Sequence, residues 1–246
     1  MEIAFERIAA WKAENHPEKW LDLRELNLKY LPPIPETVLW LNCGENALTE
    51  LLRLPKGLKK LHCYGNKLQN LLNLPKGLEE LECGGNYNIT SLEGLPDSIK
   101  QLDLTYCDGL KTITHLPLKL RKLIFNNARY LTEIQYLPPS IKFLKITDSS
   151  LRRLPESLPE SLRHIYFRHT EIESFPRLPN GLRVFYSLFD INYPSIPNLP
   201  EGLLVLSICR LLPLELPELP KSLERVDISI GDNDLICIDK YPNRCY

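Results

Sequence analysis

The chain has 246 residues, of which 25% are charged, and its formal net charge is -1 at pH 7. A chain of this length can bury a substantial core, and its near-neutral charge gives no electrostatic reason to expect nucleic acid or an anionic membrane as a partner. Charges interrupt the N-terminal segment every few residues, and no apolar run reaches about 18 residues, so we expect neither a signal peptide nor a membrane span. The seven cysteines lack the spacing of a secreted disulfide module, which favours reduced thiols and a cytoplasmic protein.

The first element in chain order is a helix over residues 2–14. Ala4, Phe5, Ile8 and Trp11 recur at helical spacing, and most charged residues fall between them. This spacing predicts an amphipathic helix with one apolar stripe. We expect residues 1–20 to form an N-terminal helical cap that lays this stripe over the Leu-rich segment that follows.

Residues 21–230 repeat one pattern with a period of 20 or 21 residues. An apolar residue followed by proline marks each period, and each pair precedes the pattern L-x-x-L-x-(L/C)-x-x-N-x-L-x-x-L, as in "LKKLHCYGNKLQNL" from Leu58. Self-similarity at this period indicates a leucine-rich-repeat solenoid of about ten to eleven repeats. The apolar–Pro pairs are Ile34-Pro35, Leu54-Pro55, Leu74-Pro75, Leu95-Pro96, Leu116-Pro117, Leu137-Pro138, Leu158-Pro159, Leu178-Pro179, Leu199-Pro200 and Leu219-Pro220.

Each repeat contains a short strand with alternating faces. Leu61 and Cys63 should point into the core, while Lys60 and His62 point into solvent. Strands of neighbouring repeats then pair in parallel about 4.8 Å apart and form a sheet on the concave face. The period leaves too little chain for a crossover helix, so the Pro-containing stretches predict an extended, polyproline-like return on the convex side.

The consensus Asn of the repeat is present only in the N-terminal part of the chain. Because this side chain should form a ladder along the stack, its loss predicts a less regular later half. The position holds Asn46, Asn66 and Asn86, and then Cys107, Ala128, Ser149, Thr170, Asp190, Leu211 and Gly231.

The last segment departs from the repeat. "VDISIGDNDLICIDKYPNRCY" begins as a strand and then lacks the Leu-Pro pair, so we expect residues 231–246 to form a C-terminal cap. No Gly/Ser-rich linker or block of charge divides the chain, which predicts a single domain.

The pattern LP-x-x-L-x-x-L-x-x-x-x-N-x-L-x-x-L-x-x-LP resembles the short, Pro-marked leucine-rich repeats of bacterial type III secreted effectors, the Yersinia outer protein M and invasion plasmid antigen H groups. The opening "LDLRELNLKYLPPIPETV" behind an amphipathic helix is similar to the way those proteins begin their repeats. Turns such as Leu95-Pro96-Asp97-Ser98-Ile99 also resemble those of amoebal and giant-virus repeat proteins. The resemblance, over about residues 20–230, implies a protein-binding solenoid without the ligase domain, in the cytoplasm of its own or a host cell.

The residues that could form a metal or catalytic site can also be explained by a purely structural role. Cys43, Cys63 and Cys83 occupy one position in three repeats, but stacked strands place them in a line, whereas zinc needs ligands that converge on a tetrahedron. We therefore expect buried, reduced, metal-free thiols. None of the five histidines has a nucleophilic partner at fixed spacing, and there is no Gly-rich phosphate loop. We expect no enzyme, no cofactor and no metal.

The outward positions of the later strands carry large aromatic and cationic side chains, which are typical of binding hot spots. A register slip in "RVFYSLFDINYPSIP" is the alternative, because it would place Phe185, Leu188 or Phe189 in the core. The candidate partner-binding residues are Phe143, Lys145, His164, Tyr166, Arg168, Tyr186, Leu188 and Phe189.

The sequence therefore predicts a non-enzymatic protein–protein interaction module that binds a protein partner through its concave face, as a host-directed effector or a viral protein. Two alternatives remain open: a substrate-recognition adaptor for a separately encoded ubiquitin ligase, and a self-assembling structural protein. We expect a monomer, with self-association as the alternative.

Overall fold

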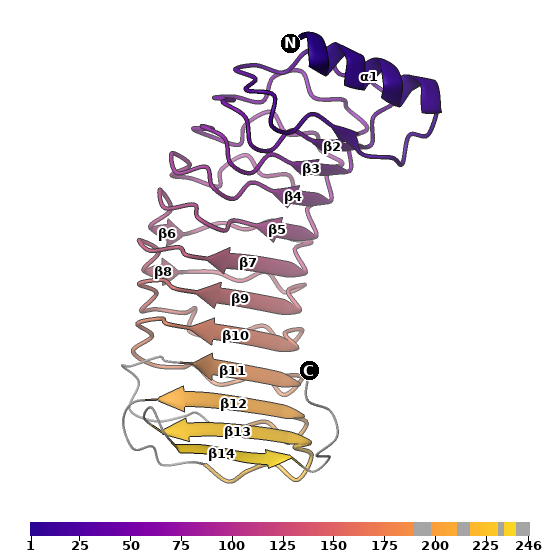
Figure 1. Ribbon diagram of the computed structural model, residues 1–246. Helices are drawn as coiled ribbons and strands as arrows, with labels where there is room; N and C mark the ends of the chain where they lie inside the picture. Colours follow the sequence, from indigo (N-terminus) through magenta and orange to yellow (C-terminus); the bar gives the residue numbers. More distant parts are fainter. Residues whose placement is uncertain (189–197, 211–216, 231–233, 240–246) are drawn as a thin grey trace.

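The computed structural model describes residues 1–188, 198–210, 217–230 and 234–239. In these residues, one helix is followed by short strands that stack one above the other along a curved solenoid (Figure 1). Twelve described strands form one sheet, in which every neighbouring pair except the last is parallel. Their bounds are β1 (Leu21–Asp22), β2 (Trp40–Asn42), β3 (Lys60–His62), β4 (Glu80–Glu82), β5 (Gln101–Asp103), β7 (Lys122–Asn126), β9 (Phe143–Thr147), β10 (His164–Arg168), β11 (Val184–Leu188), β12 (Val205–Arg210), β13 (Arg225–Ile230) and β14 (Asp234–Asp239).

The strand register follows the repeat. Leu41 pairs with Leu61, and Leu61 with Leu81, so each step along the sheet is one period of the sequence. Within β3 the burial alternates, with Leu61 buried between half-buried Lys60 and His62. This is the alternation that a pleated strand with one core face requires. The predicted leucine-rich-repeat solenoid with its N-terminal helix is confirmed.

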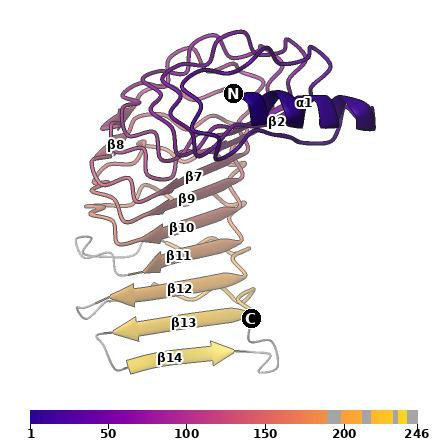
Figure 2. The ribbon, with the colours of Figure 1, turned by 45° about the horizontal axis from the view of Figure 1, so that its top comes forward.

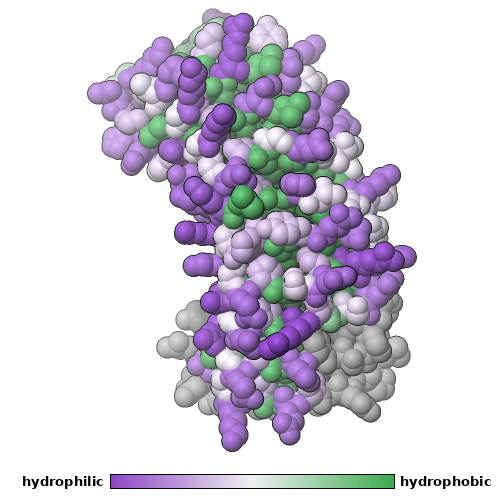
Figure 3. All heavy atoms as spheres, turned by 180° about the vertical axis from the view of Figure 1, so that it is seen from behind, coloured by the Kyte–Doolittle hydropathy of each residue, from purple (hydrophilic) through white to green (hydrophobic). Residues whose placement is uncertain are grey.

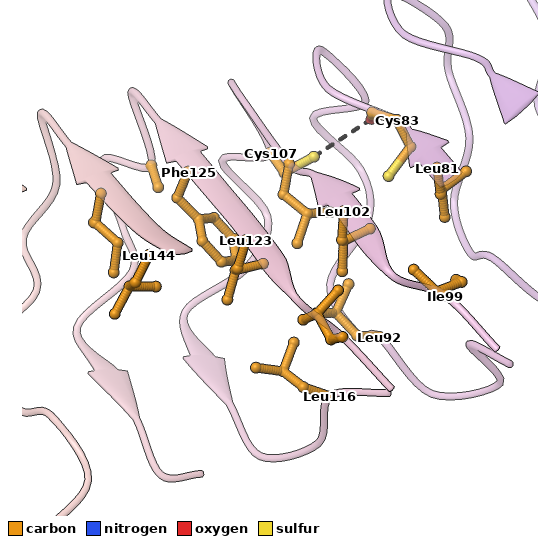
Figure 4. Packing of buried hydrophobic residues seen from close by; sticks show 14 of the residues in the cluster. Leu81, Cys83, Leu92, Ile99, Leu102, Cys107, Leu116, Leu123, Phe125 and Leu144 are labelled. Atoms are coloured by element: carbon orange, nitrogen blue, oxygen red, sulfur yellow. Dashed lines mark hydrogen bonds between the residues drawn. The ribbon is translucent and has the colours of Figure 1, made fainter. Parts of the chain in front are cut away.

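The core lies between the sheet and the returning chain. Inward residues of consecutive strands, such as Leu81, Leu102 and Leu123, form one row, and Leu92 and Leu116 meet them from the return side (Figure 4). Each fully buried leucine contributes about 1.5–3 kcal/mol relative to exposure. Seen from behind, hydrophobic residues form a band along the stack between hydrophilic flanks (Figure 3). The strict positions of the repeat are therefore core positions shared with the next repeat.

The proline of each pair sits in a turn that leads into the next strand. The backbone N–H of Leu58 donates to the carbonyl of Pro55 over 3.1 Å, and Leu78 and Ile99 repeat this bond to Pro75 and Pro96. Between the strands the described return segments contain no helix, as the short period predicted. In the middle of the solenoid the return also forms a second, two-stranded parallel sheet of β6 (Thr112–Ile113) and β8 (Glu133–Ile134), which the sequence did not predict.

The described strands of the later half are longer than those of the early half, and that the later half is less regular stays a prediction. β2 to β5 have three residues each, whereas β7, β9, β10 and β11 have five. In the early repeats the Asn side chain bonds to a backbone carbonyl of the strand segment. Asn66 Nδ2 and Asn86 Nδ2 both donate to the carbonyl of Cys63. From β7 onward the repeats lack this Asn and the strands of the main sheet are longer, whereas β5, whose repeat has Cys107 at that position, still has three residues. Figure 2 shows β7 to β13 as a straight stack from which the N-terminal half bends away.

The N-terminal helix α1 (Glu2–Glu14) lies over the first repeat and buries Ala4, Ile8 and Trp11. The indole N–H of Trp11 donates to the carbonyl of Lys19 over 2.9 Å, which fixes the chain that leaves the helix. Phe5 was predicted to belong to the buried apolar stripe, and this prediction was wrong, because Phe5 is 51% exposed. It lies about 100° around the helix from Ala4, and this angle turns it away from the repeat.

At the other end β14 pairs antiparallel with β13, so the chain turns back and covers the last parallel strand. Among the described residues, no helix has the length and apolar character needed to cross a bilayer.

Candidate functional site

The concave face is built from the outward residues of the strands, and the pairing places them in columns. Phe143, His164 and Val184 form one column, Lys145, Tyr166 and Tyr186 the next, and Thr147, Arg168 and Leu188 the third. Phe185 is fully buried, whereas Val184, Tyr186 and Leu188 are half-buried on the outward side. The register therefore does not slip in this repeat.

Three aromatic rings contact one another on this face, and we call them the aromatic ladder: Phe143, Tyr166 and Tyr186. The ring centroids of Tyr166 and Tyr186 are 4.7 Å apart with planes at 11°, a stacked pair. Those of Phe143 and Tyr166 are 5.3 Å apart and tilted by 35°. Burial, and then the neighbouring Tyr186, raise the pKa of Tyr166 above its usual value, so its phenol stays neutral. The ladder is a preformed, half-buried apolar strip.

Polar and cationic groups surround the ladder. The ammonium of Lys122 lies 5.7 Å from the Phe143 ring centroid, within cation–π range. His164 is tilted against the other side of Phe143, with centroids 6.1 Å apart. Lys145 is half-buried, and Arg168 is exposed at the end of β10.

The structure thus brings together seven of the eight predicted partner-binding residues on β9, β10 and β11. Phe189, the eighth, lies outside the described residues. That these residues form a binding site stays a prediction.

A hollow of about 660 Å³ lies on the same sheet but nearer the N-terminus, and it contains no residue of the aromatic ladder. Its walls combine carboxylates with tyrosine rings. Glycines make room for those rings, since a Cβ on Gly44 would lie 2.8 Å from the ring of Tyr64. The sequence contained a signal for this hollow, because glycine at outward strand positions is unusual. The lining residues include Glu45, Tyr64, Glu82, Asp103, Tyr87 and Tyr106.

Beside the hollow, an imidazole lies between two carboxylates. His62 Nε2 is 3.1 Å from Glu80 Oε1, and His62 Nδ1 is 3.3 Å from Glu82 Oε2. Burial is the main cause that raises the pKa of Glu82; the charge of His62 opposes it, and the charges of Asp103 and Glu80 act in the same direction as burial. Burial acts in the same direction on Glu80, but its hydrogen bonds with His62 and Lys60 outweigh it and lower its pKa. His62 was predicted to point into solvent, but its contact with these two carboxylates was not predicted.

The predicted burial of Cys43, Cys63 and Cys83 is confirmed, since all three are fully buried and unpaired. Desolvation raises the pKa of Cys43 to about 12, which keeps it a thiol at neutral pH. They lie in a row, each donating its backbone N–H to the next strand. That they hold no metal stays a prediction.

Comparison with known proteins gives structural neighbours only: no family model matches the chain, and neither does any curated protein sequence. YopM from Yersinia enterocolitica WA-314 is 27% identical with a TM-score of 0.55, and the match covers 93% of this chain. The chain spans 59% of that YopM chain. A Shigella effector leucine-rich-repeat domain is also 27% identical, with a TM-score of 0.54 and coverage of 78% of this chain and 76% of that one.

CroV588, a circular leucine-rich-repeat protein, is 22% identical with a TM-score of 0.54, over 81% of this chain and 34% of its own, and this similarity shows the fold alone. Together these neighbours confirm the resemblance to effector-like leucine-rich-repeat proteins. Repeat folds of this kind are generally interaction modules, and these neighbours suggest such a module here.

Proposed function

We propose that this chain is a non-enzymatic protein-binding module whose partner docks on the concave sheet over β9, β10 and β11. The aromatic ladder is the observation that carries the proposal. A contiguous apolar patch exposed on a folded protein marks an interaction site, and Phe143, Tyr166 and Tyr186 place three contacting rings on this face, half-buried and covered by no other described element. Large aromatic side chains of this kind dominate binding energy at protein interfaces.

The ladder is also rigid before a partner arrives. The rings stand on three consecutive parallel strands whose inward residues Leu144, Ile165 and Phe185 are fully buried. Binding therefore costs little side-chain entropy, which favours affinity. The surrounding charges are mostly positive, from Lys122, Lys145 and Arg168. The partner surface that fits is an apolar centre flanked by carboxylates.

The comparisons favour one setting for this activity. The Shigella neighbour is described as an effector, at 27% identity over 78% of this chain. We extend the proposal to a host-directed effector or viral protein that acts as a monomer in the cytoplasm of its own or a host cell. Adaptors for a ligase share the same docking surface, so they would give the same result in the test below.

The test uses a partner obtained by affinity capture with the intact chain and then purified. Tyr166→Ala and Tyr186→Ala should each weaken binding by about 2 kcal/mol or more, roughly 30-fold, in calorimetric titration, because each removes a central ring. Arg152→Ala is the control, since Arg152 is exposed beyond the strand and pairs with Glu171 at 2.8 Å. If both tyrosine variants keep the fold and bind as tightly as the control, the partner docks elsewhere.

A further inference from the structure

We propose that His62, Glu80 and Glu82 form a binding site for one divalent transition-metal ion, of the Zn²⁺ or Co²⁺ class, on the concave face of β3 and β4. Among the described residues, this is the group whose metal-ligating atoms, one from each side chain, all lie within 4.8 Å of one another. Tetrahedral ligands at about 2.1 Å from zinc stand about 3.4 Å apart. Because the two carboxylates face different ring nitrogens of His62, closing the three groups on one ion requires side-chain rotations that bring both carboxylates to the same nitrogen.

The backbone sets this convergence. His62 on β3 is the direct register partner of Glu82 on β4, and Glu80 precedes Glu82 by two residues on the same face. Parallel strands stand about 4.8 Å apart, so the three side chains rise from neighbouring points on a rigid sheet. The buried residues Leu61 and Leu81 anchor both strands in the core. Such a scaffold holds ligands in place before the ion binds.

The donor atoms suit this class of metal. Imidazole is a ligand for Zn²⁺, Co²⁺, Ni²⁺ and Cu²⁺, and two carboxylates offset the charge of a divalent ion. Lys60 supports the arrangement, because its ammonium lies 3.1 Å from Glu80 Oε2 and leaves Glu80 Oε1 facing the imidazole. Three protein ligands leave further positions on the ion for water.

The surroundings favour a bound cation. Asp103 is the register partner of Glu82 on the next strand, so a third carboxylate stands close to the pair. The cations near these three carboxylates are Lys60 at Glu80 and, farther away, Lys122. Ionised carboxylates at these neighbouring positions repel one another. A divalent ion relieves this repulsion.

One ring face of the imidazole is covered. The ring centroid of Trp20 is 4.2 Å from that of His62, and the side chains of His62 and Glu80 are only 16% and 18% exposed. The imidazole is thereby held in place from one side, while Glu82, 42% exposed, leaves a path for the ion from solvent. This site is separate from the aromatic ladder, so the proposed protein partner can fail its test without affecting this one.

The experiment titrates the tag-free full-length protein with Co²⁺ by absorption and with Zn²⁺ by calorimetry. We expect one ion per chain and Co²⁺ bands of nitrogen and oxygen ligands, without the intense thiolate-to-metal charge-transfer band. His62→Ala and Glu82→Gln should each weaken binding at least about tenfold. His164→Ala is the matched control, because it removes another half-buried concave histidine, and it should bind as the parent does.

Three results would overturn the proposal. The first is the absence of saturable binding of either ion to the folded parent protein. The second is unchanged affinity in both His62→Ala and Glu82→Gln. The third is a thiolate band, which would assign the ion to cysteines. Circular dichroism of each variant separates loss of a ligand from loss of the fold, and Glu82→Gln keeps the shape of its side chain for this purpose.

Discussion

At the scale of the residue, Asn66 shows how one side chain ties consecutive repeats together. Its Oδ1 accepts the backbone N–H of Leu48 over 2.9 Å, and its Nδ2 donates to the carbonyls of Cys43 and Cys63 over 3.1 and 3.0 Å. The side chain is only 6% exposed. A buried amide that satisfies backbone groups of two repeats explains why the sequence keeps Asn at this position in the early repeats.

Asn66→Ala should therefore lower the free energy of unfolding by about 2 kcal/mol, because it leaves the buried N–H of Leu48 without its partner, whereas the carbonyl of Cys43 keeps the Nδ2 donor of Asn46. Urea unfolding followed by circular dichroism measures the loss. Asn70→Ala is the control, since Asn70 is exposed and makes one bond, to the N–H of Leu72. A loss for Asn66→Ala no larger than that for Asn70→Ala would mean that the side chain does not link the repeats.

At single residues, burial could be predicted from the sequence, whereas side-chain contacts between repeats could not. Burial of Cys63 could be predicted because its neighbours His62 and Tyr64 alternate with it in one strand. The meeting of His62 with Glu80 and Glu82 could not be, because the residues belong to different repeats and their contact depends on side-chain directions above the sheet. The strand register predicts which residues share a column on the sheet, but it does not predict which side chains turn toward one another.

At the scale of the element, the helix α1 acts as the cover of the first repeat. Its buried face meets a repeat that would otherwise expose Leu21 and Leu23, both of which are at most 1% exposed. Arg7 adds a polar tie, since its guanidinium donates to the carbonyl of Arg24 over 3.1 Å. A solenoid with an uncovered end repeat loses cooperativity and solubility.

Trp11→Ala should lower the free energy of unfolding by about 3 kcal/mol, through loss of a buried indole. Trp11 is 7% exposed and also bonds to Lys19, so little compensates for the cavity. Thermal and urea unfolding provide the measurement.

Phe5→Ala is the matched control on the same helix, because Phe5 is 51% exposed. It should change the stability by less than about 0.5 kcal/mol. Equal effects of the two substitutions would show that the helix does not dock through the Trp11 face. The helix itself could be predicted from its spacing, whereas the exposure of Phe5 depends on where the first repeat meets it.

The strands illustrate the same limit. The Leu-Pro period predicted where each strand begins, since the turn after the proline leads into it, as at Pro55 and Leu58. It did not predict that β7, β9, β10 and β11 are longer than β2 to β5. Loss of the consensus Asn does not by itself set the strand length, because β5 has three residues although Cys107 replaces the Asn in its repeat.

At the scale of the whole molecule, the concave face divides into two regions of different chemistry. Carboxylates, an imidazole and tyrosines gather over β3 to β5, around His62 and Glu82. Aromatic rings with cationic neighbours follow over β9 to β11, around Tyr166. One period of sequence fixes the shape of both regions, and the freely varying outward residues determine their chemistry. The fold was therefore predictable from the repeat, whereas the division of the face was visible only in part.

The central claim is that a partner contacts the aromatic ladder. The most direct measurement places a photo-reactive phenylalanine analogue at single tyrosine positions and identifies the cross-linked partner peptide by mass spectrometry. Tyr186 stands on the ladder, and Tyr136, 39% exposed, follows β8 on the return side. The account predicts a specific cross-link from position 186 and none from position 136. Cross-linking from position 136, with none from position 186, would contradict it.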